Sequence, residues 1–453
     1  MENHHNTTTF LLEKKDVVLV KPSKPTSSCV LSLSSIDNNP NLEPLCHTVY
    51  VYRSNIDSSF YNNNQADPAC LIREALSKAL VYYYPLAGKL KKKNGVPFLV
   101  ANANCKLSSL HYLDGVGVEV TKQFVFDFSS EGDSGYHPLV MQVTKFSRGG
   151  FTIGMSLSHS VCDGFGAAHF FRAVAELPNG KSVPSVKPVW KRERLVGTPT
   201  EEPLQLIEKR ATSLATSPYL PNTDLLHECF YESNDGIKRL KMSLMQECGS
   251  ETLKESFTTI EVLGAYVWRS RFRALKLNLD GKIMFWLIVE IRNILNPPLP
   301  VGYYGNAFAS AKVELLGGEL NEVPLSKLVK LIKASKKVAS NSDNIMHSLD
   351  VLETCSQLDI KFDAGGSSMV LTDWRQLGLL EEVDFGWKGS INIIPLPWNM
   401  FGYVDMCLFL PPSNVNPSMK DGVRVFVSLP RAAMAKFKEE MEAFKHGNAG
   451  ACA

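Results

Sequence analysis

Residues 149–165 read GGFTIGMSLSHSVCDGF, and this stretch indicates a buried strand that ends at a histidine. Apolar side chains alternate with small or polar ones, which is the period of a strand with one buried face; the apolar positions are Phe151, Ile153, Met155 and Leu157. His159 has the same parity, so we expect its side chain on the buried face at the strand end. We expect Gly164 to let the chain turn sharply into the next segment.

The composition is typical of a globular chain and argues against a nucleic-acid partner. The 453 residues are 44% hydrophobic and 21% charged, and a chain of this length favours two domains of about 200 residues each. A net charge of +2 leaves no basic surplus for nucleic acid. The ten cysteines form no C-x-x-C pair or zinc-spaced cluster, so we expect reduced thiols and no structural metal.

The longest apolar run is too short for a membrane span. It reads IMFWLIV at 283–289, and the polar N-terminus MENHHNTTTF has no apolar leader. We therefore expect a soluble cytoplasmic protein.

Helices and strands are mixed along the chain, which predicts an α+β fold. Strands are expected in DVVLVKPS (16–23) and TVYVYR (48–53), and a helix from Pro68 after an Asp67 N-cap. A second helix is expected at 258–277, and a last one whose apolar face carries Met434, Phe437, Met441 and Phe444. No G-x-G-x-x-G or P-loop is present, which argues against a nucleotide fold.

A proline-rich, charged segment suggests where the chain divides. PSVKPVWKRERLVGTPTEEP lies inside it and has weak periodicity, as expected of a linker. We predict an N-terminal lobe at 1–185, a crossover linker at 186–222 and a C-terminal lobe at 223–453.

Two motifs about 220 residues apart resemble the signatures of the plant BAHD acyl-CoA-dependent acyltransferases. They are HSVCDG at 159–164 and DFGWK at 384–388. Four further stretches are similar to the family: SLSSIDNNP (32–40), YYYPLAGKL (82–90), NPPLPVGYYGNAF (296–308) and LTDWRQLG (371–378). The chain looks most like the branch of spermidine hydroxycinnamoyltransferases and taxane and alkaloid acyltransferases. Two departures stand out: Lys388 replaces the usual glycine, and a hairpin is missing after Lys93.

The resemblance implies two similarly built mixed-sheet lobes, as in chloramphenicol acetyltransferase, with a solvent channel between them. A segment near 372–400 would pack back on the N-terminal lobe. His159 would lie midway along the channel, reached by acyl-CoA from one side and a small-molecule acceptor from the other. A histidine near its usual pKa of about 6.5 can take the acceptor's proton as it attacks the thioester. Acyl-CoA is a substrate, and no cofactor is expected.

Two residues next to His159 have alternative roles. Asp163 could orient the imidazole as in a hydrolase triad, but the resemblance implies a structural ion pair with Arg292. Cys162 could form an acyl-enzyme, although a small thiol in a turn is commonly a packing residue. The resemblance gives the second signature, with Asp384 and Gly386, a structural role.

The remaining site residues are also implied by the resemblance. Thr372 and Trp374 are expected to stabilise the oxyanion of the tetrahedral intermediate. Tyr304, Gly305 and Asn306 are expected to shape the acyl end. Ser256, Thr258 and Thr259 are expected on the CoA side; they could equally be an N-cap cluster for the following helix.

Three functions are compatible with these motifs: an acyltransferase, a hydrolase and a non-catalytic binding protein. No G-x-S-x-G elbow supports a hydrolase, and His159 argues against loss of catalysis. We expect a monomeric acyltransferase with an aromatic acyl donor, hydroxycinnamoyl or benzoyl, and a polyamine acceptor such as spermidine. The alternative is benzoyl or acetyl transfer to an alkaloid or terpenoid alcohol. A polyamine would favour carboxylates in the channel, and Asp37 and Glu381 are candidates.

Overall fold

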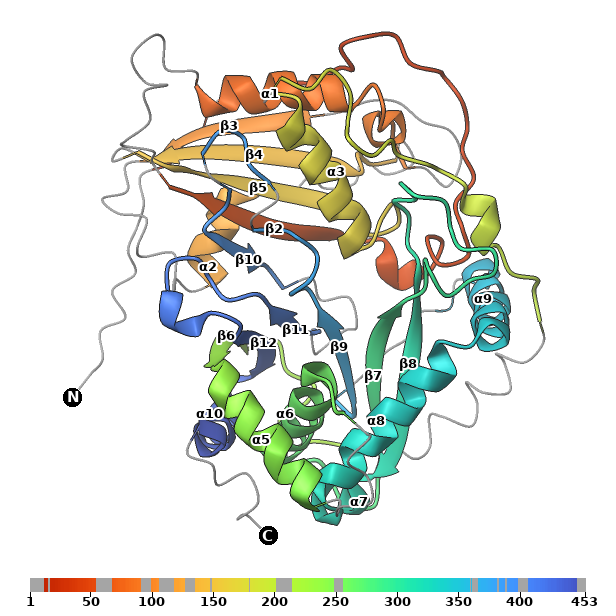
Figure 1. Cartoon of the computed structure of the whole chain (residues 1–453), viewed down its shortest axis with the longest axis vertical. Helices are drawn as coiled ribbons and strands as arrows, with labels where there is room; N and C mark the ends of the chain where they lie inside the picture. The colour runs from red at the N-terminus through yellow and green to blue at the C-terminus, as the bar shows by residue number, and fades with distance from the viewer. Residues whose placement is uncertain are drawn as a thin grey trace.

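The computed structural model contains two six-stranded sheets, each covered by helices (Figure 1). It describes residues 12–14, 17–53, 67–90, 99–105, 118–126, 135–146, 149–178, 180–200, 214–247, 256–358, 360, 366–380, 383–387, 389–397 and 406–445. None of the helices in these ranges is long and apolar enough to cross a membrane.

The first sheet has the strand order β1-β3-β4-β5-β2-β10. Its neighbours are antiparallel except for the parallel pair β3 and β4. The bounds are β1 Leu12–Lys14, β2 Leu45–Tyr52, β3 Leu99–Cys105, β4 Leu139–Phe146, β5 Phe151–Ser158 and β10 Asn392–Pro395. Helices α1 (Pro68–Ala79) and α3 (Gly164–Glu176) cover one face, and the short helices α2 (Val118–Thr121) and η5 (Lys122–Phe124) lie on the other.

The second sheet has the order β6-β12-β11-β9-β7-β8. Its strands are β6 Leu225–Glu232, β7 Lys282–Glu290, β8 Phe308–Leu316, β9 Ser368–Asp373, β11 Cys407–Leu410 and β12 Val423–Pro430. The helices of this half are α5 Asn234–Glu247, α6 Thr259–Leu275, α7 Gly317–Glu322, α8 Leu325–Ala339, α9 Ser342–Gln357 and α10 Arg431–Lys445. Helix α6 packs on the sheet through Trp268, whose ring lies 5.3 Å from that of Phe285 in β7. The expectation of two similarly built lobes is confirmed.

The helices begin and bury residues as the sequence predicts. Asp67 caps α1 by accepting a hydrogen bond from the Ala69 N–H, and Pro68 is its first residue. The four apolar residues expected on one face of α10 are all buried. Short 3₁₀ helices lie at Pro40–Leu42 (η1), Tyr84–Ala87 (η3), Arg192–Leu195 (η7) and Pro417–Met419 (η9).

Two expectations about strands are wrong. Residues 17–23 form no continuous strand, because Lys21 and Ser23 bond instead to Ser77 of α1. Strand β5 is buried on both faces, not on one. The segment 118–126 covers the second face, where the Ser156 hydroxyl donates to the Phe126 carbonyl at 2.9 Å. The alternating polar residues of β5 are therefore buried positions that form hydrogen bonds, and they do not face solvent.

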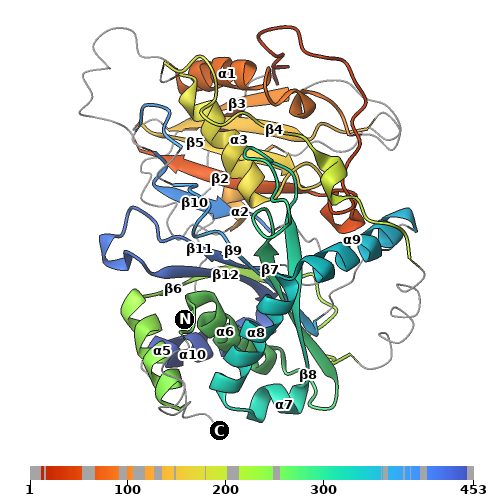
Figure 2. The same ribbon diagram turned by 45° about the vertical axis from the view of Figure 1, so that its right-hand side comes forward.

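The two lobes share strands and buried polar contacts. Strand β10 follows β9 in the chain but pairs with β2 of the first sheet (Figure 2). Arg424 of β12 is buried and donates to Asn392 Oδ1 at 2.6 Å and to the Ile393 carbonyl at 3.1 Å. The region 372–400 thus contains a strand of the first sheet. The boundaries at 185 and 223 remain predictions, and 201–213 of the linker lies outside the described residues.

Candidate active site

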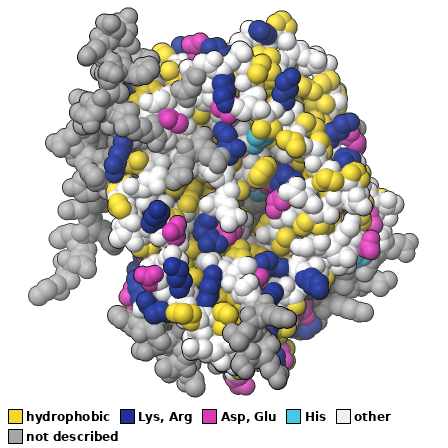
Figure 3. Space-filling view, viewed as in Figure 1, with side chains coloured by type: hydrophobic (Ala, Val, Ile, Leu, Met, Phe, Trp, Pro, Cys, Tyr) yellow, Lys and Arg dark blue, Asp and Glu magenta, His cyan; other side chains and the backbone are white. Residues whose placement is uncertain are grey.

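His159 lies directly after the last residue of β5, where residues of the two lobes meet. Its side chain is half-buried. The ring of Phe308, the first residue of β8, stands perpendicular to the imidazole with centroids 6.2 Å apart. The face shown in Figure 3 is hollowed near its centre, between the lobes, and charges of both signs are mixed around the hollow. A half-buried imidazole at this boundary can meet substrates that enter between the lobes.

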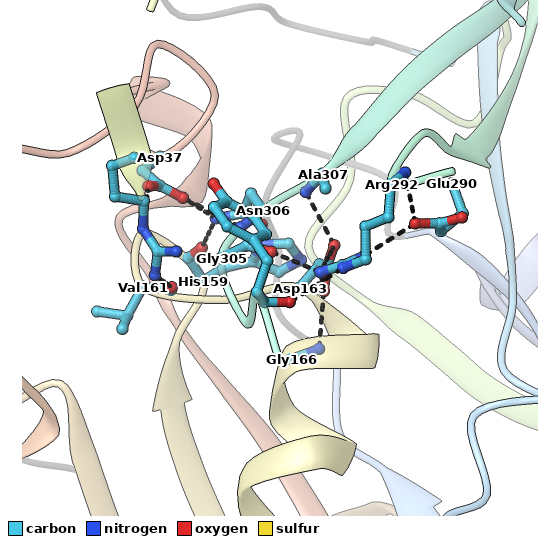
Figure 4. A network of polar contacts seen from close by, with 12 residues as sticks. Asp37, His159, Val161, Asp163, Gly166, Glu290, Arg292, Gly305, Asn306 and Ala307 are labelled. Carbon is cyan, nitrogen blue, oxygen red and sulfur yellow. Dashed lines mark hydrogen bonds and ion pairs between the residues drawn. The ribbon is translucent and has the colours of Figure 1, made fainter. Parts of the chain in front are cut away.

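Asp163 caps helix α3 and pairs with Arg292, which follows β7 (Figure 4). Arg292 Nη2 lies 2.8 and 3.0 Å from the two carboxylate oxygens of Asp163. The carboxylate also accepts from the N–H of Gly166 at 2.9 Å and of Ala307 at 3.0 Å. Burial alone would raise the pKa of Asp163, but the Arg292 charge and these hydrogen bonds hold it below its ordinary value. The expected ion pair is present, and the Asp163 carboxylate is bound by Arg292 and by two main-chain N–H groups.

Burial favours the neutral form of the His159 imidazole. Burial lowers the pKa of His159 below its ordinary value, although Asp163, the histidine's own backbone carbonyl and the Asn306 side chain act to raise it. An imidazole with a lowered pKa carries a free lone pair near neutral pH. This is the state that a general base requires.

The missing side chain of Gly164 leaves space for the LTDWRQLG segment (371–378). Gly164 starts α3, and its φ is not among the positive ones. A Cβ at this position would lie 2.9 Å from Leu377 Cδ1 and 3.7 Å from Trp374 Nε1. The chain turns between β5 and α3 at 159–161, before Gly164, and the missing side chain of Gly164 serves close packing. This packing brings the Trp374 indole N–H next to the histidine motif, and Thr372 lies two residues before it at the end of β9.

Cys162 is buried behind the motif. Its side chain is 3% exposed, and burial raises the pKa of its thiol well above the ordinary value. A thiol held protonated is a poor nucleophile.

A second buried ion pair, Asp37 with Arg192, lies behind His159. Arg192 Nε is 2.9 Å from Asp37 Oδ2, and the two side chains are 1% and 0% exposed. The guanidinium lies over the Trp190 and Tyr304 rings, 4.1 and 4.9 Å from their centroids. Asp37 therefore does not face an acceptor, while Glu381 lies outside the described residues.

The GNAF segment serves this ion pair. A Cβ on Gly305 would lie 1.9 Å from Arg192 Nη1, so the guanidinium occupies the space that the glycine leaves. Tyr304 is 2% exposed. Arg192 thus fills the space beside Gly305, and a role of this segment at the acyl end stays a prediction. Asp37 lies in the quoted SLSSIDNNP stretch, but nothing local in the sequence distinguishes Arg192, which falls in the predicted linker.

The second signature packs on the first lobe, away from His159. Asp384 accepts a hydrogen bond from the Gly386 N–H at 2.8 Å, and Gly386 has a φ of +98°, which favours glycine. Phe385 is buried against Phe171 of α3, and Trp387 packs on Phe151 of β5. Lys388 and the place of the missing hairpin, 91–98, lie outside the described residues.

The residues expected on the CoA side lie at the N-terminus of α6 among three lysines. Thr258 and Glu261 form a capping box, so the N-cap alternative is realised there. Lys241 Nζ donates to Thr259 Oγ1 at 2.9 Å, and Lys333 Nζ donates to the Ser256 carbonyl at 3.3 Å. The third lysine, Lys336, pairs with Glu261 at 2.7 Å. This end of α6 is consequently rich in N–H donors and positive charge.

Comparisons with known proteins agree with this site. A family model described as "Transferase family" matches residues 10–444. The spermidine coumaroyl-CoA acyltransferase of Arabidopsis thaliana is 45% identical, with 96% of each chain covered. The spermidine sinapoyl-CoA acyltransferase of the same plant is 40% identical over 96% of this chain and 98% of its own. The 3'-N-debenzoyl-2'-deoxytaxol N-benzoyltransferase of Taxus canadensis is 33% identical, covering 96% of this chain and 97% of its own.

Solved structures share the fold. Vinorine synthase has a TM-score of 0.73 at 20% identity, over 96% of this chain and 98% of its own. TRI101 of F. sporotrichioides, complexed with coenzyme A and T-2, has a TM-score of 0.64 at 16% identity, over 92% and 99%. The two-lobed fold and the histidine motif therefore define an acyl-CoA-dependent acyltransferase. The chain belongs to the BAHD family of these enzymes.

Proposed function

We propose that this enzyme transfers an aromatic acyl group, hydroxycinnamoyl or benzoyl, from acyl-CoA to an amine of a polyamine such as spermidine. The support for the substrates is the 45% and 40% identity to two relatives named for spermidine and hydroxycinnamoyl-CoA esters. The observation that carries the mechanism is the half-buried His159 next to Asp163, which forms an ion pair with Arg292. Burial lowers the pKa of His159, so the imidazole can accept a proton.

The transfer proceeds directly in a ternary complex. The acceptor nitrogen attacks the thioester carbonyl carbon while His159 takes its proton, and a tetrahedral intermediate forms. As the C–S bond breaks, the imidazolium returns the proton to the departing CoA sulfur. The protonated, buried Cys162 supports this route over an acyl-enzyme.

The oxyanion of the intermediate needs donors, and Trp374 and Thr372 are proposed for this role. The indole Nε1–H lies next to the first turn of α3, which begins five residues after His159. A preorganised donor of this kind lowers the activation barrier by about 2.7–4 kcal/mol.

The acyl-CoA enters from the α6 side, where its phosphates meet positive charge. Ser256, Thr258 and Thr259 supply polar atoms, and Lys241 and Lys333 supply cations. Asp163 and Arg292 hold the main chain around His159, and Asp384 and Gly386 hold the second signature on the first lobe. The enzyme works as a cytoplasmic monomer with no cofactor, through a channel between the lobes.

The alternative acceptor is an alkaloid or terpenoid alcohol that receives a benzoyl or acetyl group. It is favoured by the taxadien-5-alpha-ol O-acetyltransferase of Taxus chinensis, which is 34% identical.

The test assays each of coumaroyl-, benzoyl- and acetyl-CoA with spermidine and with aliphatic alcohols. Thiol release and product mass are measured for each combination. We expect the fastest turnover with an aromatic donor and spermidine, and a loss of about 10²–10⁴-fold with His159→Ala. Thiol release that needs no acceptor would indicate a hydrolase, and no release with any donor would indicate a binding protein. A preference for alcohols would favour the alternative acceptor.

A further inference from the structure

The Asn306 carboxamide joins Asp37 to the main chain of His159 (Figure 4). Asn306 is 0% exposed, and its Nδ2 donates to Asp37 Oδ1 at 2.7 Å and to the His159 carbonyl at 2.6 Å. The two N–H bonds of a carboxamide point in fixed directions. Two acceptors therefore fix the side chain, and through it the carbonyl of the histidine.

Asp37 is itself fixed by a buried framework. Arg192 and the Ser34 N–H both contact Asp37 Oδ2, at 2.9 and 3.1 Å. Arg192 Nη2 also donates to the Val161 carbonyl at 2.7 Å. The turn after β5 is thus held at two carbonyls, those of His159 and Val161, by side chains that contact the same carboxylate.

The place of the imidazole depends on the main chain that carries it. Asn306 fixes the carbonyl of His159, and Arg192 fixes that of Val161 two residues later. The Asn306 side chain also acts to raise the pKa of His159. Asn306 therefore affects both the position of the imidazole and its basicity.

We propose that Asn306, held by Asp37 and Arg192, is a positioning residue that fixes the main chain at His159 and thereby the place of the imidazole. This inference rests on the proposed function, in which His159 is the general base. It gives Asn306 a role in proton transfer and not in binding the acyl group.

The charged groups around His159 come from four segments. Asp163 at the start of α3 is paired with Arg292 after β7, and Asp37 before η1 is paired with Arg192. Both pairs remain when Asn306 is shortened. A change in the pH dependence of Asn306→Ala therefore reports on the loss of Asn306, which acts on His159 both directly and through its hydrogen bond to Asp37.

The experiment measures kcat, KM and the pH profile of Asn306→Ala. We expect kcat to fall about 10- to 100-fold, since one buried hydrogen-bond donor is lost. We expect KM for both substrates to change by less than about twofold, because the Asn306 side chain is fully buried. The acid limb of kcat/KM is expected at lower pH, because contacts that raise the pKa of His159 are removed.

The matched control is Asn392→Ala. Asn392 is also a buried asparagine bound to a buried arginine, with 2.6 Å between its Oδ1 and Arg424 Nη1, but it lies in β10. It should lower the melting temperature while kcat and the acid limb stay as in the wild type. If Asn306→Ala does not fold, Asn306→Ser keeps a small polar side chain that is too short to span both acceptors.

The outcomes separate this inference from the proposed function. If His159→Ala stays active, base catalysis itself is wrong. If His159→Ala is inactive but the Asn306 variants keep wild-type kcat and acid limb, only the positioning role is wrong. A rise in KM at unchanged kcat would show that Asn306 acts in substrate binding, which would also overturn the inference.

Discussion

Removal of Arg292 tests whether Asp163 is structural. In Arg292→Ala the Asp163 carboxylate, 12% exposed, keeps its two main-chain hydrogen bonds but loses its counter-charge. An unpaired buried charge costs about 3–5 kcal/mol. With an unfolding entropy of about 2.1 cal/mol/K per residue, the 453-residue chain should lose about 3–5 °C in melting temperature if it unfolds as one unit. If a lobe of about 200 residues unfolds alone, the loss is about 7–12 °C.

Differential scanning calorimetry and steady-state kinetics measure both effects. The matched control is Arg431→Ala, because Arg431 pairs with Asp224 through the same 2.8 and 3.0 Å contacts on the surface. Exposed pairs contribute little, so this variant should melt with the wild type. Arg292→Ala should lose stability and rate together.

The structural role would be refuted by either of two results. One is a wild-type melting temperature for Arg292→Ala. The other is Asp163→Asn that is inactive at unchanged stability, which would show that the aspartate acts on the imidazole as in a triad.

Three further changes test other parts of the site and the fold. His159→Ala should fold normally and lose about 10²–10⁴-fold in turnover, and more than a tenth of wild-type activity would contradict the base role. Cys162→Ser should change turnover little and acyl-CoA alone should give no burst of CoA; an acyl adduct on Cys162 would establish a covalent route. Glu232 is 1% exposed with no hydrogen-bond partner for either carboxylate oxygen among the described residues, and burial raises its pKa to about 8. The unfolded state releases this proton near pH 4.5, so the charge destabilises the fold increasingly from there up to about pH 8. Glu232→Gln should therefore raise the melting temperature most at pH 8 and least near pH 5, and a gain independent of pH would contradict the reasoning.

Local patterns in the sequence predicted the elements, and the resemblance predicted the Asp163–Arg292 pair. Helix α1 follows from Asp67 and Pro68, and α10 from its apolar face, because caps and periodicity act within a few residues. The pair could be anticipated because both of its residues lie in or next to quoted motifs.

The framework behind His159 could not be predicted, because it depends on contacts between distant segments. Arg192 reaches Asp37 from a segment with weak periodicity, whose prolines and charges suggested a linker. Gly164 and Gly305 have no local signal that distinguishes a turn from close packing. The serines of β5 were misread because the covering segment 118–126 lies outside the strand.

The pairing of β10 with β2 sets a constraint on how the protein is made. At the ribosome, β2 emerges about 340 residues before β10. At a translation rate of roughly 5–20 residues per second, the edge of β2 stays unpaired for about 17–70 s after β2 is synthesised. An open strand edge is a site of intermolecular pairing. Chaperone occupancy during synthesis should therefore concentrate on this edge, and co-expression of a 1–385 fragment with the remaining residues should recover less protein than the intact chain.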